Sequence, residues 1–83
     1  MLSPAQNLAE HIKDWEFIEL WLYPMVFPPR ILMLVGDKNG KCCIYSPSGN
    51  YKPLFLSSSY DEAHSWLVED KYEQVDGSFY RQK

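Results

Sequence analysis

The sequence predicts a two-layer α+β fold in the order helix, three strands, helix, and a final strand or small hairpin. Three observations support this fold class: two segments begin with helix caps, one apolar run is too short for an independent helix, and turn residues separate the extended segments. The chain has 83 residues, of which 46% are hydrophobic. That content is sufficient for one small domain spanning residues 1–83.

A first helix is expected at about residues 4–22. Ser3 is suited to the N-cap, Pro4 to the first helical position and Gln6 to a capping box. Apolar residues then recur at spacings of three and four, which places them on one helical face. They are Leu8, Ile12, Trp15, Ile18 and Leu22. Pro24 is expected to end the helix, because proline disrupts the preceding helical turn.

Three strands are expected to follow as an antiparallel meander, at about 30–36, 41–46 and 51–57. The first is a continuous apolar run, which is typical of a central strand covered on both faces. Asp37–Gly40 and Pro47–Asn50 supply the turn residues between strands. Pro53 cannot donate a ladder hydrogen bond, so the third strand is expected at an edge.

A second helix is expected at about 60–70, where Ser59 and Glu62 form a capping-box pattern. The final strand or hairpin is expected at about 72–80. A right-handed crossover would place this strand parallel to the strand at 30–36.

The distribution of charge argues against a nucleic-acid partner. The net charge is −3, and residues 60–76 alone carry −5. The acids of this segment are Asp61, Glu62, Glu69, Asp70, Glu73 and Asp76. A weaker alternative is nucleic-acid binding through scattered bases and tyrosines. Those residues are Arg30, Lys38, Lys41, Lys52, Tyr45 and Tyr51.

The sequence contains no pattern typical of a catalytic, metal or cofactor site. Cys42 and Cys43 are adjacent, so on a strand they point to opposite faces and cannot converge on one ion. His11 and His64 are far apart in sequence and are expected on exposed helical surface. We therefore expect a protein that is not an enzyme and binds no cofactor.

The sequence also indicates a soluble, cytoplasmic protein without a membrane partner. The apolar stretch from Trp15 to Val35 is interrupted by charged residues and prolines, which a membrane span would exclude. The N-terminal residues do not follow the pattern of a secretory signal, and adjacent cysteines are unsuited to a disulfide.

One aromatic segment points to function. On a helix, part of the run from Trp15 to Phe27 would fall outside the core-facing stripe and form an aromatic patch near the end of the helix. The candidate partner-binding residues are Phe17, Leu20, Trp21, Tyr23, Met25 and Phe27. The hypothesis is a non-enzymatic interaction or regulatory module that binds a protein partner or itself. The alternatives are that these aromatics are simply core, or that a pocket between the first helix and the sheet serves a small-molecule-binding or enzymatic domain.

Overall fold

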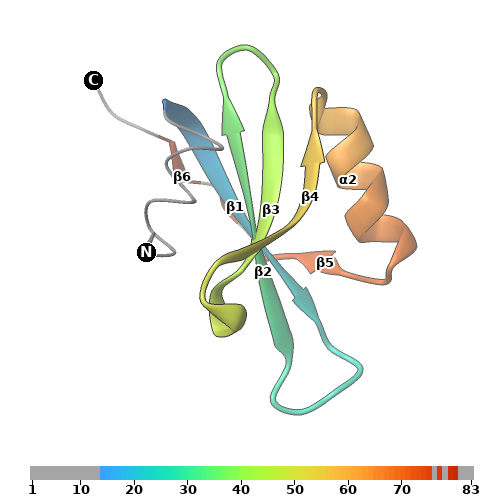
Figure 1. Ribbon diagram of the computed structural model, residues 1–83. Coiled ribbons are helices and arrows are strands. Elements are labelled where there is room, and N and C mark those ends of the chain that lie inside the picture. The colour runs from blue at the N-terminus through green and yellow to red at the C-terminus, as the bar shows by residue number, and fades with distance from the viewer. Residues whose placement is uncertain (1–13, 76, 78, 81–83) are drawn as a thin grey trace.

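A computed structural model describes residues 14–75, 77, 79 and 80, and within them the chain forms one antiparallel sheet and a single helix (Figure 1). The sheet order is β4-β3-β2-β1-β5, and β6 also pairs with β1. The strands are β1 (Trp15–Tyr23), β2 (Arg30–Asp37), β3 (Cys42–Ser46), β4 (Lys52–Ser57), β5 (Glu73–Gln74) and β6 (Phe79–Tyr80). The helix is α2 (Tyr60–Glu69), and a short 3₁₀ turn η1 (Pro47–Gly49) joins β3 to β4.

The prediction of a first helix is wrong over residues 15–22, because this segment is strand β1. It pairs antiparallel with β2, from Trp15 opposite Asp37 to Tyr23 opposite Arg30. Apolar residues occupy both faces of β1, so their positions fit a helical period as well as an extended one. The abundance of aromatic residues in WEFIELWLY favours the strand, and the neighbouring β2 supplies its hydrogen-bond ladder. The predicted residues 4–13 of that helix lie outside the described residues.

The meander therefore has four strands, β1 to β4, rather than three. Strands β2, β3 and β4 lie where the apolar run and the turn residues predict strands. Strand β2 is central, between β1 and β3, and β4 is at an edge, in agreement with its Pro53. In the β2–β3 turn, Oδ1 of Asp37 accepts hydrogen bonds from the backbone N–H groups of Asn39 and Lys41. Gly40 provides the positive φ of 91° that this turn requires.

Helix α2 begins at a cap that joins it to the end of β4. Ser59 Oγ accepts from the Glu62 N–H at 3.2 Å, as the capping pattern predicts. In a capping box the glutamate side chain also accepts from the N–H of the cap residue, and here the Ser57 hydroxyl stands between these two groups. This hydroxyl donates to Glu62 Oε1 at 2.6 Å and accepts from the Ser59 N–H at 3.0 Å. This network fixes the direction in which the helix leaves the sheet.

The expectation of a final strand parallel to residues 30–36 is also wrong. Strands β5 and β6 are two residues each, and both pair antiparallel with the outer side of β1. In the described part of the chain both pair with β1 and not with each other, so the expected small hairpin is not seen there. The reason is that β1 occupies the place beside β2 at which the last strand was expected. Asp76 and Ser78 lie outside the described residues.

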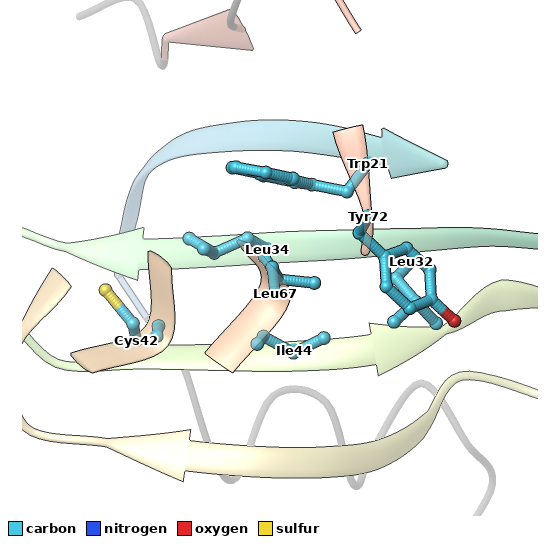
Figure 2. Packing of buried hydrophobic residues seen from close by; sticks show 8 residues of the cluster. Trp21, Leu32, Leu34, Cys42, Ile44, Leu67 and Tyr72 are labelled. Carbon is cyan, nitrogen blue, oxygen red and sulfur yellow. The ribbon is translucent and has the colours of Figure 1, made fainter. Parts of the chain in front are cut away.

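Buried clusters lie on both faces of the sheet. On the face covered by α2, side chains from β1, β2 and β3 meet those of the helix and Tyr72, as Figure 2 shows. The cluster consists of Trp21, Leu32, Leu34, Cys42, Ile44, Ala63, Leu67 and Tyr72. On the other face Val35, Cys43 and Tyr45 are buried, with Trp15, Ile18 and Met33 packed against them. Burial on both faces explains why β2 and β3 lack a simple apolar–polar alternation.

In the described part of the chain, α2 does not have the length and apolar character needed to cross a bilayer.

Candidate functional site

The structure separates the residues of the predicted aromatic patch. Trp21 is 2% exposed and belongs to the core under α2. Phe17 and Tyr23 are half-buried against the same core, where their rings contact Tyr60 and Tyr72 at centroid distances of 5.8 and 5.5 Å. Leu20 lies on the opposite face of β1, because successive strand residues alternate in direction.

The other two residues, Met25 and Phe27, lie on the β1–β2 loop with Val26 between them. The Phe27 side chain is 94% exposed, that of Met25 72% and that of Val26 44%. We call these three residues the apolar loop tip. The loop extends away from α2, beyond the end of the sheet (Figure 1). Of the predicted patch, the structure therefore leaves only Met25 and Phe27 largely open.

A buried carboxylate, Glu19, connects β1 to α2. Its side chain is 6% exposed and lies on the helix-covered face of the sheet. Trp21 Nε1 donates to Glu19 Oε1 at 3.1 Å, and the Tyr60 hydroxyl lies 3.1 and 3.0 Å from the two carboxylate oxygens. The His64 ring contacts both aromatic donors, at centroid distances of 5.2 Å from Trp21 and 5.6 Å from Tyr60.

A carboxylate, a phenol and an imidazole in contact resemble the components of acid–base catalysis. In this structure, however, the carboxylate is engaged by two donors that also build the core. The hollows lined by Phe55 and Trp66 and by Leu56 and Lys41 include neither Glu19 nor His64. The arrangement is best explained as a satisfied buried polar network that positions α2 on the sheet.

The adjacent cysteines point to opposite faces of β3, as their positions on a strand predict. Cys42 lies in the cluster under α2 and Cys43 in the cluster on the other face. Burial, with smaller contributions from Asp37 and Glu19, raises the pKa of Cys42 to about 11. Burial also raises the pKa of Cys43, against the opposing effects of Tyr45 and Lys41, and it raises the pKa of Tyr45. Thiols that hold their protons in this way are poor nucleophiles and poor metal ligands.

Within residues 14–75, 77, 79 and 80, histidine, cysteine, aspartate and glutamate do not gather in a group of three or more that could hold a metal ion. His64 is half-buried beside Trp21 and Tyr60, which differs from the exposed position expected for it. His11 lies outside the described residues.

A second feature lies between α2 and β4. The Phe55 and Trp66 rings stack there, with centroids 5.3 Å apart and planes inclined by 19°. They line a hollow of about 460 Å³, which we call the α2–β4 hollow. Its lining residues are Phe55, Asp61, Glu62, Ser65, Trp66 and Glu69. The hollow is thus lined by two aromatic rings and three acidic side chains.

Sequence reasoning missed both Glu19 and the α2–β4 hollow. Glu19 stands two residues from Phe17 and from Trp21, which places all three on one face of a strand but not of a helix. For the hollow, the spacing of Glu62, Trp66 and Glu69 on one helical face was a usable signal. The contribution of Phe55 depends on how the helix packs. The pocket expected between a first helix and the sheet has no counterpart over residues 15–22, because this segment is itself part of the sheet.

Comparison with known proteins yields no assignment: no family model matches the chain, and no significant match is found among curated proteins or solved structures.

Proposed function

We propose that this chain is a non-enzymatic interaction module that binds a partner protein through the apolar loop tip, Met25, Val26 and Phe27. The observation that carries the proposal is the 94% exposed side chain of Phe27, two residues along the loop from a 72% exposed methionine. Aromatic residues and methionine are enriched at protein interfaces, and a projecting ring is suited to insertion into an apolar pocket.

The backbone of this loop supports the same function. Pro24, Pro28 and Pro29 flank the apolar loop tip, and each proline fixes its own φ angle. The base of the loop is held by the paired ends of β1 and β2, with Tyr23 opposite Arg30. A loop with few accessible conformations loses little entropy on binding, so more of the contact energy remains as affinity.

The experiment compares the full chain with a Met25→Ser/Phe27→Ser double variant. Each protein is immobilised, a retained partner is identified from the native source, and its affinity is then measured with purified components. We expect the double variant to weaken binding by at least about 30-fold, which corresponds to roughly 2 kcal/mol at an interface hot spot. Its melting temperature should be unchanged, because both side chains lie outside the core.

The matched control is Val68→Ser, since Val68 is an apolar residue that is 50% exposed on α2. This control should retain the partner with wild-type affinity. Self-association through the loop would appear instead as a concentration-dependent sedimentation coefficient that the double variant abolishes. A monomeric wild type that captures nothing, or equal capture by the double variant, would contradict the proposal.

A further inference from the structure

Strand β4 is an edge strand, with β3 as its neighbour in the described sheet. In an antiparallel ladder, alternate residues of an edge strand direct their N–H and C=O groups away from the sheet. Pro53 lacks an N–H, but it stands near the beginning of the strand. A β-bulge at Leu54 interrupts the β3–β4 register, because Ile44 pairs with Phe55 but Tyr45 pairs with Pro53. The regular stretch from Phe55 to Ser57 therefore retains backbone donors and acceptors for a further strand.

The side chains of this edge are not those that block pairing. Edge strands are commonly protected by charges, prolines, β-bulges or a covering element, and β4 has one such bulge, at Leu54. Here Lys52 and Pro53 stand at one end of β4, whereas Leu54 and Leu56 are 43% and 50% exposed farther along. Both leucines lie on the face opposite α2, where an added strand would cover them.

On the other face of β4, an added strand would meet the α2–β4 hollow. Figure 1 shows α2 running beside β4, on the side away from β1. Phe55 points toward the helix and stacks on Trp66, so the hollow begins directly at the edge strand. Because side chains alternate along a strand, every second side chain of an added segment would reach this hollow.

The acidic residues that line the hollow favour a positively charged side chain in it. Asp61, Glu62 and Glu69 contribute three carboxyl groups, and none of the described lining residues is basic. The Trp66 ring adds an aromatic surface, to which a cation is attracted. Lysine and arginine therefore match the hollow both in charge and in the apolar stem that precedes it.

We infer that β4 and the α2–β4 hollow form a docking groove for an extended basic segment of a partner protein, which joins the sheet as an additional strand. Lysine or arginine side chains enter the hollow at alternate positions, and the apolar side chains between them cover Leu54 and Leu56. Backbone hydrogen bonds to β4 supply the register. This surface is separate from the apolar loop tip.

The test uses a defined probe, a peptide of alternating lysine and valine, titrated into the full chain and followed by amide NMR shifts. Saturable shifts and slower amide exchange are expected in β4, together with shifts in the outer residues of α2. An Asp61→Lys/Glu69→Lys variant should weaken binding by about tenfold, because reversed charges repel the peptide. If that variant does not fold, Asp61→Asn/Glu69→Gln takes its place with the same direction of effect.

The matched control is Glu73→Lys, which reverses an exposed acid on β5, away from β4 in the sheet order. It should bind the peptide as the wild type does, and so should the Met25→Ser/Phe27→Ser variant, which separates this groove from the loop. Equal binding of an alternating glutamate–valine peptide would overturn the inference, as would shifts outside β4 and α2. A dimer paired through β4 that excludes the peptide would overturn it as well.

Discussion

At the scale of single residues, Glu19 shows how a buried charge can be accommodated in a small core. Its carboxylate accepts from Trp21 on the same strand and from Tyr60 on the helix, 41 residues away in sequence. Among the described residues, every buried side-chain nitrogen and oxygen has a hydrogen-bond partner. The network therefore ties α2 to the sheet without leaving a buried polar atom unsatisfied.

Replacing Glu19 tests this account. Glu19→Ala removes the acceptor of the buried Trp21 N–H and of the half-buried Tyr60 hydroxyl, and a buried donor left unsatisfied costs about 1–3 kcal/mol. We expect the free energy of unfolding in urea to fall by roughly 2–4 kcal/mol. Glu19→Gln keeps one acceptor oxygen and should lose clearly less. If both variants had the same urea midpoint of unfolding as the wild type, the network would not stabilise the fold.

Burial of Cys42 predicts how the stability of the protein depends on pH. The pKa of Cys42 is raised from 9.0 to about 11, so between these values the folded chain holds a proton that the unfolded chain releases. The stabilisation is complete below pH 9 and is lost as the pH rises through 11, at a rate on the order of 1 kcal/mol per pH unit.

The measurement compares urea unfolding of the wild type and Cys42→Ala from pH 7.5 to 10.5. The free energy of unfolding should fall more steeply with pH in the wild type than in Cys42→Ala. Part of the fall should remain in both proteins, because burial also raises the pKa of Cys43 and Tyr45. If the free energy of unfolding fell equally with pH in the two proteins over this range, the steeper loss could not be assigned to Cys42.

At the scale of elements, the packing of Phe17 on Gly36 tests strand β1. The two residues are paired across β1 and β2, and a Cβ atom on Gly36 would overlap the Phe17 ring. Gly36→Val should therefore lower the free energy of unfolding by about 1–3 kcal/mol through overpacking.

In a Phe17→Ala background, the same change should cost much less, because the ring that it strikes is gone. Thermal melts of the four proteins form a double-mutant cycle, and the coupling should exceed about 0.5 kcal/mol for residues in contact. If the two substitutions changed the free energy of unfolding additively, residues 17 and 36 would not be in contact. That result would contradict the pairing of β1 with β2 and would agree with a helix over residues 15–22.

At the scale of the whole molecule, the sheet is assembled from both ends of the described chain. β1 lies between β2 and the two short strands β5 and β6, and α2 crosses from the β4 edge toward β5. In the sheet of the described residues, this order leaves β4 at an edge and places the β1–β2 loop beyond the sheet (Figure 1). Both proposed interaction surfaces are therefore consequences of strand order.

Local chemistry in the sequence was sufficient to locate several elements. The cap at Ser59, the turn residues after Asp37 and the edge position implied by Pro53 depend on hydrogen bonds and φ angles within a few residues, and all three appear in the structure. The sequence left open whether Met25 and Phe27 are exposed or core, and only the structure shows them exposed on the β1–β2 loop.

Tertiary structure decided what the apolar pattern of Trp15–Tyr23 left open, namely whether this segment is a helix or a strand, and with it how the residues of the predicted patch are distributed. This segment has apolar residues at both odd and even positions. Such a pattern fits an amphipathic helix and a strand covered on both faces equally well, so the apolar period does not distinguish the two. The choice follows from β2, which offers β1 a complete ladder, and from α2, which buries Trp21 and supplies Tyr60 to Glu19. The α2–β4 hollow has the same origin, because Phe55 and Trp66 stack only once the helix lies on the sheet.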